Sequence, residues 1–567
     1  MLVAIAIKVE VVAVSRLNRR LLAATTIIMV AILSFAIAPG TAHAADTGAM
    51  TVDGTVATRY DAYRLFSATV VDDADTDQKI ATDVTWANDA ICQAVLPVLH
   101  DAGLDSSAST AQSAAEWMNA DGHMTTALTA KLARAIVKAG AVSVSLNAGT
   151  TAELPCGYWL IVADDDAIAQ NEAGTAPIMA LVGDSAVTVK PKAATPKVSK
   201  HVLEDGIAAW CKAADATVAD DLYWRLSATV PAGLTAYDTY TVRFVDTMGA
   251  GLDPSKVAAS MHVYVAAGAE GGFDAVQTGK DGRAGTDPAK GWTDITARCA
   301  TKVAADGKTF TVRTGDLVAA LGGADAFTAG ARVVAVYNAP LNSACNHGIA
   351  KGNPNEVYLR YPRSPFTDQS GDADFTRTPS DDACAYTWDL ALTKRGSDGD
   401  KPLAGAVLSI ADDRGRTLAA DGTWDAEGKA TVTTGEDGRV TVSGVDSGKL
   451  EVRELKAPKG YTAFEGARSV TVKAEGLDVD QVAAAKPKLT ITAESPLRAD
   501  SADGSTGSLE ASLINTPTGT PPSITTGGFM PSTGDMAMYA AAAAAVAGAA
   551  LIVVALLVKR GGGSHKE

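Results

Sequence analysis

Short runs in which apolar and polar residues alternate fill the chain between residues 385 and 517. The runs are separated by turns such as Asp398-Gly399, Glu427-Gly428 and Asp437-Gly438. Because successive side chains of a strand point to opposite faces, this alternation gives each strand one apolar face to bury. The pattern therefore predicts a small all-β unit in this segment.

Two other segments precede this unit. Residues 45–193 mix strand patterns with two stretches, 89–102 and 125–138, that carry apolar residues at helical spacing. Residues 194–384 consist of short strand patterns with many glycine and aspartate turns. We expect a mainly β chain of tandem β-sandwich domains, bounded at 45–193, 194–384 and 385–517, with added helices in the first domain.

Composition and motifs limit what these domains can do. The formal net charge of −16 argues against a nucleic-acid partner and suits a soluble extracellular surface. The sequence has no C-x-x-C pair and no H-E-x-x-H cluster, so we expect no metal centre and no cofactor. No Ser/His/Asp arrangement can be recognised, which argues against a surface hydrolase. We therefore do not expect the chain to be an enzyme.

The N-terminus carries an export signal. Arg16, Arg19 and Arg20 precede an apolar stretch over residues 21–38, and Ala42-His43-Ala44 supplies the small residues of a cleavage site. This order predicts a secretory signal peptide over residues 1–44. The mature chain is expected to begin at Ala45.

The C-terminus carries a second processing signal over residues 530–567. Its first five residues are Met530, Pro531, Ser532, Thr533 and Gly534. The apolar run over 536–558 that follows is long enough to span a bilayer, and Lys559-Arg560 would hold its end on the cytoplasmic side. Residues 518–529 are rich in Thr, Pro and Gly, which predicts an extended spacer.

Strand periodicity places polar residues within apolar stripes. In the last segment Lys394, Glu454 and Asn515 each stand two residues from apolar residues of the same strand face. Three buried polar groups in one small domain are costly unless they pair. In an apolar pocket a lysine loses its proton and a carboxylic acid keeps its own. The neutral amine can then attack the amide carbonyl while the acid polarises it, so that ammonia leaves and a Lys–Asn isopeptide bond remains.

The middle segment repeats this arrangement with other residues. Lys200, Asp246 and Asn355 each lie in line with apolar neighbours two residues away. Asn353 is a competing candidate for the role of Asn355. The same reasoning predicts a second buried set of lysine, acid and asparagine.

Several of these motifs resemble those of sortase-assembled backbone (major) pilins, which are wall-anchored proteins of Gram-positive bacteria. The strings L-A-L-T-K-R-G, L-E-V-R-E-L-K-A-P-K-G-Y and L-I-N-T-P look like a CnaB-type, SpaA-like domain, although some positions of the glutamate motif differ from the usual pattern. This resemblance implies an Ig-like, Cna-type fold. It also implies that Lys394 and Asn515 are bonded and that Glu454 is the catalytic acid.

The middle segment is similar to the D2 domain of the same family. The resemblance rests on P-K-V-S-K-H-V, Y-D-T-Y-T-V-R-F-V-D-T-M and G-N-P-N-E-V-Y-L-R-Y-P. It implies a bond between Lys200 and Asn355, with Asp246 as the acid. The pentapeptide M-P-S-T-G resembles the LPXTG sorting signal, with Met in place of Leu. In that family a sortase cysteine attacks the Thr–Gly carbonyl and an amine resolves the thioester.

The string V-T-V-K-P-K resembles the pilin motif, which usually ends in Y-P-K. By position Lys192 would be the amine that joins the next subunit, and Lys190 is the runner-up. The opening strand of the first segment has no lysine on its apolar face, so no isopeptide bond is expected there.

The resemblance implies a shaft subunit of a covalent surface pilus that supports adhesion. Thr533 of each subunit would be joined to Lys192 of the next. The implied partners are class C and housekeeping sortases, further copies of the chain arranged head to tail, peptidoglycan, minor pilins and host receptors. The alternative is a monomeric peptidoglycan-anchored adhesin that binds a host protein or glycan and does not need Lys192.

Six cysteines in an exported chain suggest disulfides rather than metal ligands. Cys92 with Cys156 and Cys299 with Cys345 are the preferred pairs, because the members of each pair lie in one segment. The other two cysteines lie near the ends of the middle segment, and other connectivities stay open.

Overall fold

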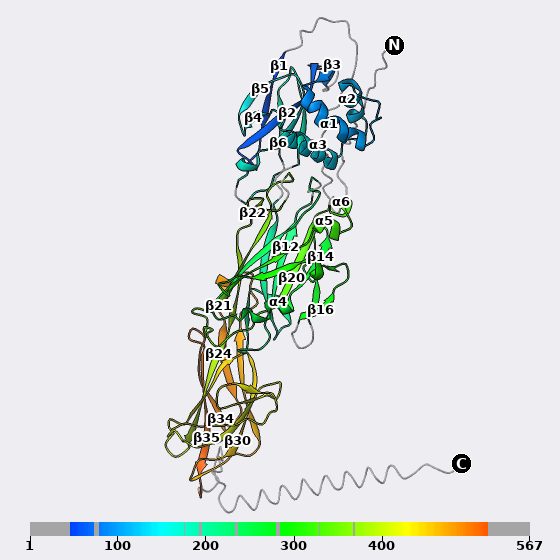
Figure 1. The fold of residues 1–567 in the computed structure, drawn as a ribbon. Helices are drawn as coiled ribbons and strands as arrows, with labels where there is room; N and C mark the ends of the chain where they lie inside the picture. Colours follow the sequence, from blue (N-terminus) through cyan, green and yellow to red (C-terminus); the bar gives the residue numbers. More distant parts are fainter. Residues whose placement is uncertain are drawn as a thin grey trace, which may run out of the picture.

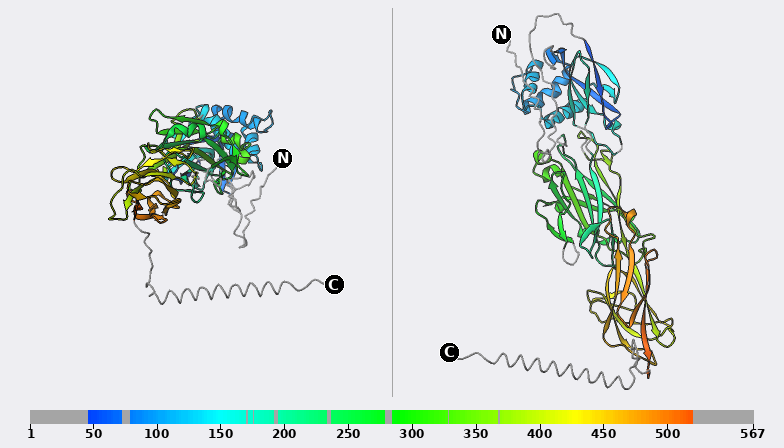
Figure 2. Two further views of the ribbon diagram at one scale, coloured as in Figure 1. Left: turned by 90° about the horizontal axis from the view of Figure 1, so that it is seen from below. Right: turned by 180° about the vertical axis from the view of Figure 1, so that it is seen from behind.

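The computed structural model describes residues 46–519, except for 73–78, 170, 175, 192–194, 233–235, 279–283, 328 and 367–368. Figures 1 and 2 show that these residues form a rod of three successive lobes. We call them the N-terminal lobe (46–191), the middle lobe (195–386) and the C-terminal lobe (388–519). Strands dominate the regular structure, and the long helices lie in the N-terminal lobe (Figure 1). The predicted mainly β fold, with helices added to the first part, is confirmed.

The N-terminal lobe combines two sheets with three helices. The larger sheet has the order β3-β2-β6-β7, with β4 paired to β2, and the smaller sheet has the order β5-β1-β8. The strands are β1 (Thr47–Val52), β2 (Arg59–Asp72), β3 (Lys79–Trp86), β4 (Val144–Asn147), β5 (Thr151–Pro155), β6 (Gly157–Ala163), β7 (Ile178–Val182) and β8 (Val187–Val189). The helices are α1 (Asp89–Asp101), α2 (Ala111–Asn119) and α3 (Thr126–Lys138).

Two of the three helices match the sequence prediction. Helices α1 and α3 coincide with the stretches 89–102 and 125–138, whereas α2 was not predicted. Each helix begins where a side-chain oxygen, of Asn88, Thr110 or Thr125, accepts a backbone N–H of the first turn. The buried face of α2 consists of three alanines and one methionine, which is a weak apolar stripe. Such a stripe is too weak to predict α2 from the sequence.

The middle lobe is a sandwich of two sheets, and its main core cluster draws residues from both. One sheet has the order β10-β9-β12-β20-β14-β17, and the other has the order β11-β23-β21-β13-β19-β18, with β22 paired to β21. The elements are β9 (Lys197–Glu204), β10 (Ala209–Cys211), β11 (Ala213–Asp215), β12 (Tyr223–Val230), β13 (Arg243–Met248), α4 (Val257–Ser260), β14 (His262–Ala267), β15 (Val276–Thr278), β16 (Ala284–Pro288), β17 (Thr293–Asp294), β18 (Ala300–Val303), β19 (Thr309–Arg313), α5 (Leu317–Ala320), α6 (Ala324–Phe327), β20 (Ala331–Asn338), β21 (Asn353–Pro362), β22 (Phe375–Arg377) and β23 (Asp381–Tyr386).

The C-terminal lobe is a second sandwich. One sheet has the order β29-β24-β35-β31, with β34 paired to β35, and the other has the order β27-β26-β25-β30-β32-β33, with β28 paired to β25. The first and last long strands of the lobe, β24 and β35, are parallel neighbours. The strands are β24 (Trp388–Gly396), β25 (Val407–Ala411), β26 (Thr417–Leu418), β27 (Trp424–Asp425), β28 (Val432–Thr433), β29 (Arg439–Val445), β30 (Gly448–Lys456), β31 (Tyr461–Thr462), β32 (Ala467–Glu475), β33 (Lys488–Ala493), β34 (Leu497–Asp503) and β35 (Ser508–Pro517).

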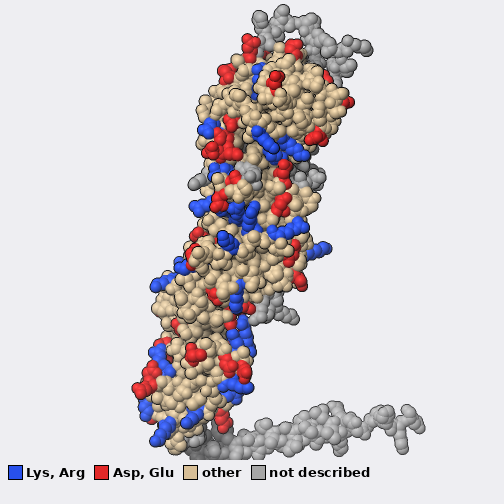
Figure 3. All heavy atoms as spheres, viewed as in Figure 1, with Lys and Arg blue, Asp and Glu red and all other residues tan. Residues whose placement is uncertain are grey.

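The surface of the rod carries charges of both signs. On the face seen in Figure 3, basic and acidic side chains are interspersed along all three lobes. Within the described residues no helix is both long enough and apolar enough to cross a membrane. The predicted signal peptide, sorting signal and membrane span lie outside those residues.

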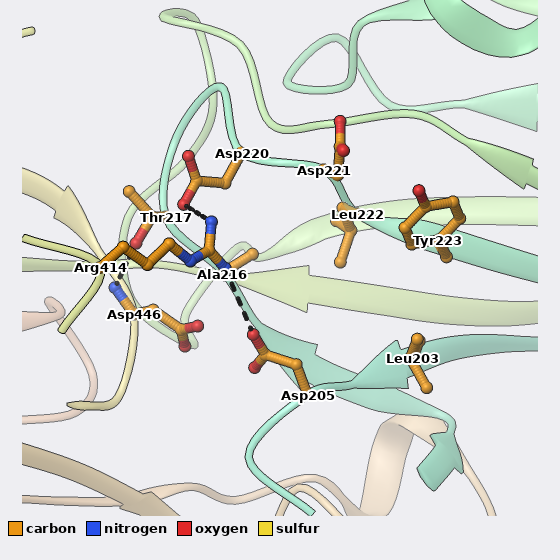
Figure 4. A pocket seen from close by; sticks show the side chains of 10 residues that line it. All are labelled: Leu203, Asp205, Ala216, Thr217, Asp220, Asp221, Leu222, Tyr223, Arg414 and Asp446. Carbon is orange, nitrogen blue, oxygen red and sulfur yellow. Dashed lines mark hydrogen bonds and ion pairs between the residues drawn. The ribbon is translucent and has the colours of Figure 1, made fainter. Parts of the chain in front are cut away.

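The middle and C-terminal lobes meet at a polar junction. The indole nitrogen of Trp388 and the hydroxyl of Ser447 both donate to Asp215 Oδ2, each over 2.6 Å. Arg414 donates to Asp220 Oδ2 over 2.9 Å. Figure 4 shows this arginine between the carboxylates of Asp220 and Asp205. The cavity here measures about 20 Å³, which is room for about one water molecule.

Four carboxyl groups gather at this junction, contributed by Glu204, Asp205, Asp215 and Asp446. Burial, reinforced by the nearby Asp215 carboxylate, raises the pKa of Glu204 to about 8. Burial also raises the pKa of Asp446 well above its ordinary value, again with Asp215 as the next cause. The folded junction therefore holds protons that the unfolded chain releases. Its stabilisation is present below the ordinary carboxyl pKa and is lost as the pH rises towards about 8.

We expect the melting temperature of the ectodomain to fall between pH 5 and pH 8, and Asp446→Asn to reduce this fall. An amide needs no added proton to donate to neighbouring carboxylates. Differential scanning calorimetry at the two pH values measures the change. Glu436→Gln, at an exposed turn of the same lobe, is the control and should keep the wild-type dependence. An unchanged pH dependence in Asp446→Asn would contradict the assignment.

Candidate functional site

The C-terminal lobe brings Lys394, Glu454 and Asn515 into contact at its centre. Lys394 comes from β24, Asn515 from the neighbouring strand β35, and Glu454 from β30 of the opposite sheet. Lys394 Nζ donates to Asn515 Oδ1 and lies 3.0 Å from Glu454 Oε1. Asn515 Nδ2 donates to the same glutamate oxygen over 2.9 Å. One carboxylate oxygen thus touches both the amine and the amide.

The surroundings of this cluster are apolar. The side chains of Lys394 and Glu454 are fully buried, as the predicted strand faces require. Lys394 Nζ lies 5.8 Å from the centre of the Phe464 ring, and the backbone N–H of Phe464 donates to Glu454 Oε2 over 3.1 Å. Burial lowers the pKa of Lys394 to about 8, against the opposing effect of Glu454. The neutral amine is therefore accessible near neutral pH.

The middle lobe holds a second cluster that spans its two sheets. Lys200 lies on β9 of one sheet, whereas Asp246 on β13 and Asn355 on β21 belong to the other. All three side chains are fully buried, as predicted from their strand faces. Lys200 Nζ donates to Asp246 Oδ2. Burial lowers the pKa of Lys200 to about 8 and raises the pKa of Asp246, while the lysine opposes the latter shift.

Sequence reasoning missed a fourth member of the middle cluster. Tyr337 on β20 is fully buried, and its hydroxyl accepts hydrogen bonds from Lys200 Nζ over 2.9 Å and from Asn355 Nδ2 over 2.8 Å. The same hydroxyl donates to Asp246 Oδ2 over 3.1 Å. The signal for Tyr337 was its place at the end of the apolar run V-V-A-V-Y, in which residues two apart share a strand face.

The competing asparagine of the middle lobe is occupied elsewhere. Asn353 Nδ2 donates to the backbone oxygens of Asn346 and Ala385, over 2.9 and 3.2 Å, and its Oδ1 accepts the Asn346 N–H over 2.8 Å. Asn355 instead reaches the cluster through Tyr337. The geometry favours Asn355 over Asn353 as the partner of Lys200.

Lys190 of the V-T-V-K-P-K string comes directly after β8. Lys192 falls outside the described residues. Lys190 keeps 73% of its side chain exposed and pairs with Asp53 over 3.4 Å. Pro191 packs against Gly54, where an added Cβ would come within 3.0 Å of the proline ring.

The predicted disulfides are not formed. All six cysteines lie within the described residues, and among them Cys92 is not joined to Cys156 by a disulfide, nor Cys299 to Cys345. The thiols face separate partners instead: the Cys299 thiol donates to the Ile295 carbonyl over 3.3 Å, and Cys345 Sγ contacts a ring nitrogen of a nearby histidine. The two cysteines of each predicted pair lie in one sequence segment, but the fold does not bring their sulfur atoms together. Among the described residues no cluster of His, Cys, Asp and Glu is arranged to hold a metal ion.

Comparison with known proteins identifies one domain. Residues 389–486 match the family model described as SpaA, a prealbumin-like fold domain. The trypsin-resistant surface T6 protein of Streptococcus pyogenes serotype M6 is 28% identical over 134 residues. This match covers 22% of the chain and 23% of the T6 protein, so it spans about a quarter of that relative.

Solved structures of pilins resemble the chain at low identity. The T6 backbone pilin of serotype M6 Streptococcus pyogenes, described as a modular three-domain structure, has a TM-score of 0.45 and 16% identity over 84% of this chain and 99% of its own. The major pilin SpaD of Corynebacterium diphtheriae has a TM-score of 0.40 and 15% identity over 83% of this chain and 97% of its own. Both of these structures are described as pilins.

The two clusters predict an altered mass. If each neutral lysine displaces ammonia from its asparagine, the intact ectodomain should weigh two ammonia molecules less than its sequence. Glu454→Ala and Asp246→Ala should each restore one of them, which mass spectrometry measures directly. Glu454→Ala should also lower the thermal and protease resistance of the C-terminal lobe. An unmodified mass in the folded wild-type protein would exclude both bonds.

Proposed function

We propose that the chain is a shaft subunit of a covalently polymerised surface pilus of a Gram-positive bacterium. The observation that carries this proposal is the pair of buried Lys–acid–Asn clusters, one in each of two successive β-sandwiches of a rod. The matches to a SpaA domain and to a streptococcal surface protein support it.

The position of each cluster suits a protein under tension. In the C-terminal lobe the chain enters on β24 and leaves on β35, and Lys394 and Asn515 are 121 residues apart in sequence. A bond between them lets tension pass from the first strand to the last while the intervening chain stays unloaded. By analogy with a disulfide, closing a loop of this length removes on the order of 5 kcal/mol of chain entropy from the unfolded state. Unlike a disulfide, an amide cannot be reduced.

The middle lobe follows the same plan. Its first strand β9 carries Lys200, and Asn355 lies on β21, close to where the chain leaves the lobe through β23. A bond between them leaves residues 201–354 outside the path of the tension. Both lobes would therefore transmit force through their first and last strands, joined by amides.

Each subunit is joined through its C-terminal sorting signal to a lysine of the next subunit. A class C sortase cleaves after Thr533 and transfers its carboxyl group to Lys192 of the next subunit, and a housekeeping sortase attaches the last subunit to peptidoglycan. The exposed position of Lys190 and the packing of Pro191 support an accessible amine at the end of β8. Minor pilins and host receptors are the further partners, through which the fibre supports adhesion.

The sorting signal should determine where the protein is found. Replacing Thr533 by Ala or Gly534 by Ala should shift the protein from the cell-wall fraction to the membrane or the medium, because the sortase loses its cleavage site. Fractionation followed by immunoblotting measures this shift. Ser532→Ala, within the variable position of the motif, is the control. Wall attachment that persists in both variants would mean that the apolar span alone holds the protein.

Polymerisation should depend on one lysine. Lys192→Arg keeps the charge but lacks an amine that resolves a thioester, so it should abolish the ladder of SDS-resistant high-mass species in a wall extract. Export and folding should stay intact, and monomer should still reach the wall. The exposed residue Lys197 supplies the control, because Lys197→Arg should keep the ladder.

The remaining outcomes assign the acceptor. A ladder that persists in Lys192→Arg and disappears in Lys190→Arg would move the acceptor to Lys190. A ladder that persists in the double variant would exclude the motif. If the wild-type protein forms no ladder beside its own sortases, the monomeric adhesin replaces the shaft subunit.

A further inference from the structure

The two clusters contain the same reacting groups but connect them differently. In the C-terminal lobe Glu454 Oε1 lies 3.0 Å from the lysine nitrogen and accepts the asparagine N–H over 2.9 Å. In the middle lobe Asp246 bonds to Lys200, whereas the amide of Asn355 is met by the hydroxyl of Tyr337. An aspartate is one methylene shorter than a glutamate, and the phenol oxygen occupies the gap.

The hydroxyl of Tyr337 is held by all three reacting groups. A phenol has one proton to donate and two lone pairs to accept with. Its proton goes to Asp246 Oδ2, and its lone pairs receive Lys200 Nζ and Asn355 Nδ2, at 3.1, 2.9 and 2.8 Å. The ring is fixed edge-on against Phe310, with 4.8 Å between the ring centres. Both the position and the bonding capacity of this oxygen are therefore fully determined.

Two oxygens beside the phenol are unpaired. Within the described residues neither Asp246 Oδ1 nor Asn355 Oδ1 has a hydrogen-bond partner. Buried polar atoms without partners are rare and call for an explanation. Among the described atoms no direct hydrogen bond joins Asp246 to Asn355, whereas both of them bond to the Tyr337 hydroxyl.

We propose that Tyr337 is a catalytic residue of the middle-lobe isopeptide reaction and relays a proton from Asp246 to the nitrogen that leaves Asn355 as ammonia. This inference rests on the proposed function, because it requires that the Lys200–Asn355 bond forms. It assigns the relay to the middle lobe alone, since Glu454 touches its asparagine directly.

The step balances within the cluster. Neutral Lys200 Nζ attacks Cγ of Asn355, a C–N bond forms, and the carbonyl electron pair moves to Oδ1. The phenol hydroxyl then turns towards Nδ2, which takes its proton, and the phenol takes the proton of the neutral Asp246 carboxyl group in exchange. The carbonyl re-forms, the bond between Cγ and Nδ2 breaks, and ammonia leaves. The excess proton on Nζ returns to Asp246, so no external reactant is needed.

The electrostatics of the site suit a relay. Burial raises the pKa of Tyr337 well above its ordinary value, so the phenol holds a proton before and after the reaction. The Asp246 carboxyl group, whose pKa burial raises, is the proton source. A hydroxyl can rotate to pass a proton on without moving its oxygen.

The test is Tyr337→Phe, which removes one oxygen and keeps the ring. Intact mass and peptide mapping should show the Lys394–Asn515 bond formed and the Lys200–Asn355 bond absent, or formed at least about a hundredfold more slowly during incubation. Tyr240→Phe is the matched control. Tyr240 is fully buried in the same core, and its hydroxyl has no partner among the described residues. This control should lose both ammonia molecules as the wild type does.

A second variant separates catalysis from structure. In the double variant Asp246→Glu/Tyr337→Phe the longer acid can reach the amide directly, as Glu454 does, at little change in total volume. It should restore the middle-lobe bond, which a merely structural role of the hydroxyl would not allow. If Tyr337→Phe alone fails to fold, formation of the middle-lobe bond in this double variant is the test of the relay.

The outcomes distinguish the two proposals. A Tyr337→Phe protein that forms both bonds at the wild-type rate overturns the relay while leaving the pilin assignment intact. A folded double variant that stays unbonded overturns it as well. A wild-type protein without the Lys200–Asn355 bond overturns the proposed function of the middle lobe instead.

Discussion

A lysine amine enclosed by an apolar sandwich, in contact with one acid and joined to one amide directly or through a tyrosine hydroxyl, is the interaction on which this molecule depends. Away from water neither the ammonium nor the carboxylate is favoured, and each group becomes tolerable because the other is beside it. Lys394 and Lys200 both have their pKa lowered to about 8 by burial. The same burial that makes these side chains costly thus favours the neutral form of each amine.

The two sandwiches reach this arrangement by different routes. In the C-terminal lobe the lysine and the asparagine lie on adjacent parallel strands of one sheet, and the acid reaches across from the other sheet. In the middle lobe the lysine faces the acid and the asparagine across the sandwich. The acid of the middle lobe is an aspartate, and Tyr337 makes the remaining contact. In the middle lobe the Tyr337 hydroxyl thus makes the contact to the asparagine that the acid itself makes in the C-terminal lobe.

The rod also depends on how its lobes are joined. Strand β23 of the middle lobe ends at Tyr386, and β24 of the C-terminal lobe begins at Trp388, so the covalent connection is short. Charged and polar groups fill the junction, where Arg414 pairs with Asp220 and Asp215 accepts bonds from the C-terminal lobe. Hydrogen bonds and ion pairs of this kind fix how the two lobes are oriented, and their strength changes when the carboxyl groups gain or lose protons. The two buried lysine clusters and the polar junction therefore lie in different parts of the rod, the clusters within the lobes and the junction between them.

The sequence by itself determined which strand faces point inward and where two of the helices form. Alternation in steps of two identified the inward faces that carry Lys394, Glu454 and Asn515, and helical spacing identified α1 and α3. These are local properties, because strand and helix geometry fix which neighbours share a face. Only the tertiary structure decided that Tyr337 joins the middle cluster, that carboxyl groups from two lobes meet at one junction, and that the cysteines stay apart. Each of these depends on which distant strands pack together, and the periodicity of a single strand carries no information about its partner across the core.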